Sequence, residues 1–170
     1  MEVPFVIKSD PNYKESDADC QEQVDFLLKV RDKFNDIQHA VEHIRSLRGQ
    51  IDELVGKVDT VDAKALKPLA DTINKRLTKV EEALYQTKAK AGEDILNYPM
   101  RLNDRMSALY NVAASGNNAP TQQVKDAFAG LCKETDVQLD ELKGIVGNEI
   151  AEFNKTVNDR RIQVIGVKGK

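Results

Sequence analysis

A heptad seam runs through the first third of the chain. Its apolar residues recur at alternating spacings of three and four, and Arg48 interrupts one position. They are Leu27, Val30, Phe34, Ile37, Val41, Ile44, Ile51 and Val55. Because residues three and four apart share one face of an α-helix, the seam predicts a long amphipathic helix. Ser16 offers an N-cap oxygen at its start, and we expect it to end at Gly49 or Gly56.

Three further segments show the same periodicity and are separated by turn residues. They cover residues 62–88, 97–113 and 121–160. Four amphipathic helices of unequal length with short connections predict an all-α, antiparallel helical bundle. Two topologies fit. Either the second and third helices run back along the first as one broken element, in a three-helix, spectrin-like bundle, or the chain reverses at Gly92 into a four-helix, up-down-up-down bundle. We favour the reversal.

Proline, asparagine and glycine residues within these segments predict local features of the helices. Pro68 indicates that the second helix begins there or has kinked first turns. Asn97 is placed to cap the short third helix, with Pro99 in its first turn. Gly144 and Gly147 indicate a kink or a close helix crossing in the last helix.

Both ends of the chain look strand-like. Residues 3–7 are β-branched and aromatic, and a lone strand is not stable. We expect this segment to lie along the bundle or to belong to the sheet of a preceding domain. The chain then divides into a terminal strand and linker (1–15), a helical bundle (16–161) and a short tail (162–170).

The charge pattern excludes several classes of protein. The net charge is −3 and is spread evenly, so no basic face is available for nucleic acid. No apolar run approaches the ~20 residues of a membrane span. Met1 is not followed by a signal peptide, which carries no weight if the chain is a piece of a longer protein. Cys20 and Cys132 are too few for a disulfide framework, and we expect two small side chains near the core.

One string in the chain resembles a catalytic motif. His39, Glu42 and His43 match H-x-x-E-H, an inverted zinc-protease pattern that presents two imidazoles one helical turn apart. With Ile37 and Ile44 on the seam, however, both histidines fall on the flank of the helix and face water. No motif supplies a third ligand, so we expect a pair of solvated surface histidines.

Other chemistry lacks the residues that it needs. A di-metal bundle needs Glu-x-x-His on two helices, and the nearest match, Asp36 to His39, occurs once. Carboxylate pairs such as Glu81 and Glu82 are expected on solvated helix surfaces, not across a cleft. There is no phosphate-binding glycine loop or nucleophile elbow. We therefore expect no enzyme activity, no catalytic residues, no cofactor and no metal site.

The least generic segment runs from Asn97 to Asn103. One interpretation is a helix cap in which Arg101 neutralises a nearby carboxylate. The other is a docking surface for another domain, formed by Asn97, Tyr98, Arg101 and Asn103.

Several strings resemble one protein family. They are LKVRDK (28–33), EEALYQTK (81–88), LNYPMRLN (96–103), ASG (114–116) and PT (120–121). Together they resemble the C-terminal helical region of large bacterial proteins described as sialidase-like or sortilin-like glycosyl hydrolases with Asp-box repeats. The likeness covers about residues 5–153.

The resemblance implies a parent protein in which a β-propeller and an immunoglobulin-like domain come first. Residues 6–11 fit the junction after that domain, which implies that residues 1–15 are its last strand and linker. Any hydrolytic residues would lie outside this chain. The resemblance also implies a periplasmic or extracellular location.

Two functional hypotheses follow. The first is a non-catalytic accessory module of such a secreted protein, serving assembly or docking to the upstream domains or to a protein partner. The alternative is a free-standing helical adaptor or coiled-coil oligomer, suggested by the long apolar seams.

Overall fold

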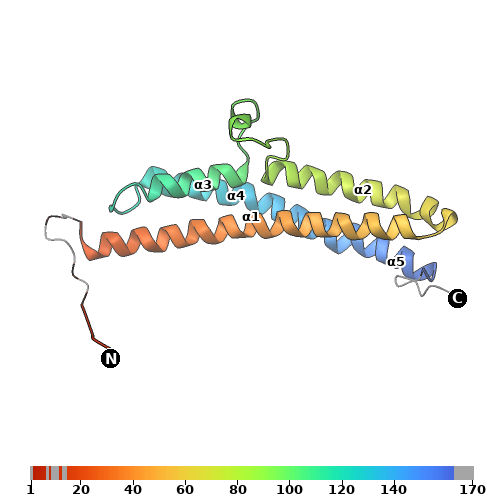
Figure 1. The fold of residues 1–170 in the computed structure, drawn as a ribbon, viewed down its shortest axis with the longest axis horizontal. Coiled ribbons are helices and arrows are strands. Elements are labelled where there is room, and N and C mark those ends of the chain that lie inside the picture. The colour runs from red at the N-terminus through yellow and green to blue at the C-terminus, as the bar shows by residue number, and fades with distance from the viewer. Residues whose placement is uncertain (1, 7, 9–11, 13–14, 163–170) are drawn as a thin grey trace.

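Three helical rods lie side by side in the computed structural model, which describes residues 2–6, 8, 12 and 15–162 (Figure 1). The first rod is α1. The second consists of α2 and α3 in line, and the third of α4, a π-helical turn and α5. Their bounds are α1 Asp17–Lys57, α2 Thr60–Leu84, α3 Leu102–Ala113, α4 Gln122–Ile145, the π turn Val146–Ile150 and α5 Ala151–Asp159. The predicted all-α bundle is confirmed.

Short polar side chains set where the helices begin. The hydroxyl of Ser16 accepts a hydrogen bond from the Asp19 amide at 3.1 Å, and the Asp19 carboxylate accepts one from the Ser16 amide at 3.0 Å. This reciprocal capping box satisfies donors that a first turn leaves free. Asp59 caps α2 through the amides of Val61 and Asp62, at 2.9 and 2.8 Å.

The chain does not reverse at Gly92, so the topology that we favoured is wrong. The C-terminal end of α2 meets the middle of α1, where Arg45 pairs with Glu81 at 2.8 Å. The C-terminal end of α3 meets the start of α1, where Gln23 donates to the carbonyl of Ala113 at 2.8 Å. Both helices therefore run antiparallel to α1, one after the other (Figure 1). This is the three-helix arrangement with a broken middle element.

The core follows the predicted seams. Its most deeply buried large side chains are Ile37, Ile44, Leu66, Ile73, Leu77, Leu84, Met106 and Ile145. Phe26 and Phe128 pack edge to face with ring centroids 5.3 Å apart. Glu81 is also buried, at 4% exposure, which corrects the expectation that this carboxylate is solvated.

The second helix starts close to the predicted residue 62, whereas the third does not start at Asn97. The second helix begins at Thr60 and contains Pro68 in its interior, because the Asp59 cap starts it two turns earlier. The third begins at Leu102, not at Asn97. Asn97 instead is the C-cap residue of a short 3-10 helix, Gly92–Leu96.

The two glycines of the last helix mark a change of helix type. Gly147 lies inside the π turn, and Gly144 lies just before it. A Cβ atom added at either position would meet nothing within 4 Å. The sites are therefore not close helix crossings.

The N-terminal segment and Cys20 differ from what the sequence predicted. Val3, Phe5 and Val6 are 75–82% exposed and form no strand in the described part of the chain. The predicted tail strand lies almost wholly outside the described residues. Cys20 is exposed, against expectation, and Cys132 is half-buried. None of the helices in the described part of the chain combines the length and apolarity that a membrane crossing requires.

Candidate docking site at the junction of α2 and α3

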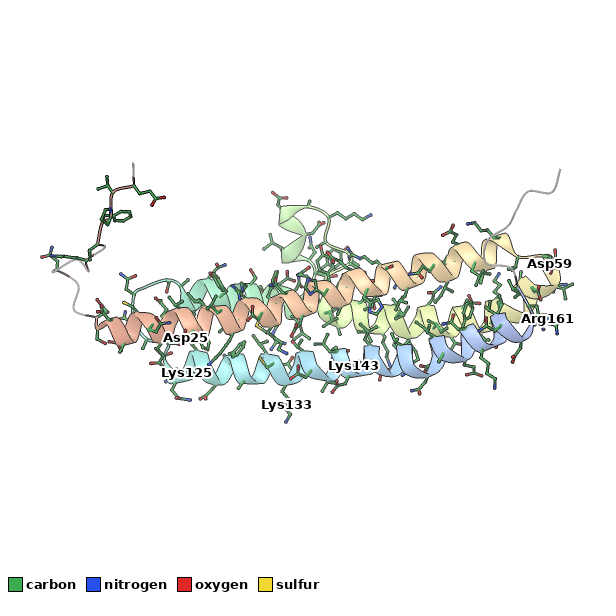
Figure 2. The ribbon with its side chains drawn as sticks, turned by 90° about the horizontal axis from the view of Figure 1, so that it is seen from below. Asp25, Asp59, Lys125, Lys133, Lys143 and Arg161 are labelled. Atoms are coloured by element: carbon green, nitrogen blue, oxygen red, sulfur yellow. The ribbon has the colours of Figure 1, made fainter. Side chains whose placement is uncertain are left out.

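The connection between α2 and α3, residues 85–101, stands out from the side of the bundle near its middle (Figures 1 and 2). Buried Gln86 closes its base. The side-chain amide of Gln86 donates to the carbonyl of Pro99 at 2.9 Å, and its oxygen accepts from the amide of Lys88 at 3.3 Å. The two ends of the connection are therefore held together across the break in the middle rod.

The outer part of the connection is organised by Asp94. Its carboxylate accepts hydrogen bonds from the backbone amides of Lys90 and Ala91, at 2.7 and 2.9 Å. These bonds favour the ionised form and lower the pKa of Asp94 below its ordinary value. Leu96, which ends the short helix, is 84% exposed. The connection thus presents an apolar side chain to solvent from a locally ordered loop.

The four predicted docking residues separate into two groups. Asn97 is exposed and Tyr98 half-buried on the outer part of the connection. Arg101 is half-buried at the N-cap of α3, and Asn103 is buried within its first turn. The capping carboxylate is Asp104, which accepts from the amide of Arg101 at 3.1 Å. This bond caps the start of α3 at Leu102. Tyr98 precedes a proline and is therefore disfavoured in helical conformation, so the helix starts after Pro99.

Two hollows flank the connection. The larger, of about 360 Å³, lies against α4. It is lined by Ala83, Met100, Arg101, Leu102, Arg105, Glu134, Val137 and Gln138. The smaller, of about 100 Å³, is lined by Tyr85, Gln86, Ala89, Tyr98, Pro99, Met100, Asn103 and Asp104. We call the larger one the junction hollow.

Charges in the junction hollow are unevenly satisfied. Arg105 holds Glu134 with two hydrogen bonds, of 2.6 and 3.0 Å. This contact raises the pKa of Arg105 and lowers that of Glu134, since each charge stabilises the other. The segment does form a helix cap, but Arg101 makes no ion pair with any described residue, so its guanidinium does not neutralise a carboxylate as the cap interpretation expected. Its Nε atom is buried without a hydrogen-bond partner.

Apolar groups lie beside this unpaired cation. Met100 and Val137 line the junction hollow and are 53% and 60% exposed. Sequence reasoning missed Val137, although a signal was present: this valine falls off the apolar seam of its helix. Val137 lines the junction hollow only because α4 packs against the junction of α2 and α3.

His39 and His43 lie where the seam predicted, exposed on the flank of α1. Both line an open groove of about 730 Å³ between α1 and α4, together with Asp36, Asp140 and Lys143 among others. Figure 2 marks Lys143 on the α4 side. Within the described part of the chain, no three histidine, cysteine, aspartate or glutamate side chains are grouped to hold a metal ion. The site closest to a zinc-protease pattern therefore offers two imidazoles and no third ligand.

Comparison with known proteins adds no relative. No protein-family model, curated protein or solved structure matches the chain. The resemblance to propeller-type glycosyl hydrolases therefore stays a prediction.

Proposed function

We propose that this chain is a non-catalytic helical module that docks a partner at the junction hollow. The observation that carries the proposal is Arg101, a half-buried cation without a partner among the described residues, beside exposed Met100 and Val137. The apolar seams of the helices are otherwise used largely in mutual burial, although single apolar side chains such as Val61 and Leu96 are exposed as well. A surface that joins unmet charge to exposed apolar area is typical of an interaction site.

The resemblance extends this proposal to a parent protein. The chain would be the accessory C-terminal module of a larger secreted protein of the propeller type, and its partner would be an upstream domain of the same polypeptide. The exposed Val3, Phe5 and Val6 support this extension, because a strand-like apolar segment needs a sheet to pair with. The coding sequence upstream of Met1 tests it. Propeller repeats there are the expected result, and their absence removes this parent.

Docking itself is tested by titrating the upstream part, expressed separately, into this chain by calorimetry. We expect saturable binding, and we expect Val137→Asp to abolish it by placing a charge in the contact. The matched control is Val61→Asp, which alters a valine of comparable exposure, 71% against 60% for Val137, at the start of α2. Equal binding by both variants would contradict docking at the junction hollow.

The coiled-coil alternative predicts self-association through the long seams. The seam residues of α1 are instead buried or half-buried against the other helices of the same chain. We therefore expect sedimentation velocity to report a monomer at micromolar concentration. A dimer that Leu27 or Phe34 variants dissociate would favour the alternative.

A further inference from the structure

Arg101 lacks a partner although its chemistry demands one. The Nε donor is buried, and no described residue accepts a hydrogen bond from the guanidinium. A buried donor that has lost water and gained no acceptor is costly, more so when it carries charge. A group of this kind calls for an acceptor from outside the chain, such as an ordered water, an ion or a binding partner.

The carboxylate that lines the junction hollow is already engaged, because Glu134 accepts hydrogen bonds from both terminal nitrogens of Arg105. Asp104, three residues after Arg101, accepts a hydrogen bond from the backbone amide of Arg101, not from its guanidinium. With Arg101 and Arg105 against Glu134, the lining of the hollow carries a net positive charge within a protein whose net charge is −3. The missing partner is therefore an anion.

The surroundings select the kind of anion. Phosphate sites gather several free donors, whereas Arg101 is the one uncommitted cation among the residues that line this hollow. Met100 and Val137 offer apolar contact on the same surface. The volume, about 360 Å³, is at the low end of the range of about 300–1,000 Å³ for ligand pockets. This combination suits a single carboxylate that is flanked by apolar side chains.

We infer that the junction hollow binds an acidic peptide segment, in which the carboxylate of an aspartate or glutamate pairs with Arg101 and a neighbouring aliphatic side chain lies against Met100 and Val137. The inference rests on the proposed docking function and specifies what the partner presents. A planar guanidinium can donate two parallel hydrogen bonds to the oxygens of one carboxylate, which the ammonium group of lysine cannot do.

Peptide titration followed by NMR tests the inference on the intact chain. The probes are acetyl-Leu-Glu-Leu-amide and acetyl-Leu-Gln-Leu-amide, which differ in one charge. We expect the glutamate peptide to shift the Arg101 Nε–H and Val137 methyl signals, and the glutamine peptide to bind about tenfold more weakly. Arg101→Gln should remove the difference between the peptides, Arg101→Lys should restore part of it, and Arg31→Gln on α1 should leave it unchanged.

Equal binding of the two peptides, or a difference that survives Arg101→Gln, would overturn the inference. The comparison of peptides on the unaltered chain needs no variant, so a folding defect in Arg101→Gln cannot decide the result. The docking function fails separately. If the upstream part still docks while both peptides bind alike, the carboxylate inference alone is wrong; if the glutamate peptide binds at Arg101 while the upstream part does not dock, the choice of partner is wrong.

Discussion

Glu81 is the single charged residue that the described core buries, and two arginines of α1 account for it. Arg45 and Arg48 bond its two carboxylate oxygens at 2.8 and 2.9 Å. Arg48 also reaches the hydroxyl of Thr78 at 3.2 Å, and the guanidinium of Arg45 lies 5.1 Å from the ring centre of Tyr85. Arg48, which interrupts the apolar seam of α1, is thus one of the two partners that allow Glu81 to be buried.

Removing this charge should destabilise the bundle. We expect Glu81→Gln to lower the free energy of unfolding by about 2 kcal/mol, below the ~3–5 kcal/mol of a fully buried pair because both arginines keep contact with water. Urea denaturation measures the change. Glu82→Gln alters the adjacent, exposed carboxylate and should leave the midpoint unchanged. Equal effects of the two substitutions would show that burial of Glu81 contributes nothing.

At the scale of the elements, the ordered conformation of the connection of residues 85–101 depends on one ionised side chain, that of Asp94. The pKa of Asp94 is lowered by its bonds to the amides of Lys90 and Ala91. A carboxyl group whose pKa falls on folding stabilises the folded form at pH values above its pKa in the unfolded chain. This contribution is lost as the pH falls through the pKa of the folded form.

Hydrogen exchange should report this dependence. At neutral pH we expect the amides of Lys90 and Ala91 to be protected, and Asp94→Asn to speed their exchange by about tenfold because the neutral amide is a weaker acceptor. Amides in α1 should exchange as before in the same sample. Unchanged exchange at residues 90 and 91 would mean that Asp94 does not order the connection.

The third rod contains an extra residue at its π turn, Val146–Ile150. A π turn closes its hydrogen bond one residue later than an α turn and so absorbs one residue without turning the rest of the helix. Arg76 of α2 pairs with Glu141 before the turn at 2.6 Å and with Glu149 inside it. These contacts tie both parts of the rod to α2. Phe153 and Val157 beyond the turn remain buried.

Deleting Gly147 should therefore be tolerated. The rod would become a continuous α-helix with Phe153 and Val157 still facing the core, and the free energy of unfolding should stay within about 1 kcal/mol of the parent. Deleting Gly130, in the regular part of α4, turns one half of the helix by about 100° against the other and should prevent stable folding. If both deletions are equally damaging, the π turn does not set the register of the rod.

At the scale of the whole molecule, the break in the middle rod divides the bundle into two hairpin-like parts that pack against each other. α1 and α2 form one part, and α3 with α4 and α5 forms the other. The principal contacts between them are those of α1 with α3 and of α2 with α4. The connection of residues 85–101 joins the parts covalently, and its outer part, which contains the short helix Gly92–Leu96, stands away from their shared core (Figure 1).

Cutting that connection should leave the bundle assembled. With a protease recognition sequence in place of residues 92–96, we expect the cleaved chain to keep its helical circular dichroism and its elution volume. Its melting midpoint should now rise with protein concentration, because unfolding separates two pieces. The uncut form of the same variant is the control. Dissociation at micromolar concentration would show that the covalent link, not the core, unites the parts.

Much of the local helical structure could be predicted from the sequence. The seam from Leu27 to Val55, the cap at Ser16 and the exposed flank with His39 and His43 depend on local spacing, which a sequence displays directly. That Asn97, Tyr98, Arg101 and Asn103 form a docking surface stays a prediction; in the structure Asn97 and Tyr98 lie on the outer part of the connection, and Arg101 and Asn103 at the start of α3. The lack of an acceptor near Arg101 depends on Glu134, which Arg105 holds, and these two residues are far apart in the chain.

The sequence by itself determined that this chain forms amphipathic helices that bury their seams against one another, because helical periodicity and capping are local. The tertiary structure alone decided that α2 and α3 run in line, that Glu81 is buried, and that Arg101 meets Val137 without an acceptor. Each of these depends on which helix face meets which, and that choice is made by packing between segments distant in sequence.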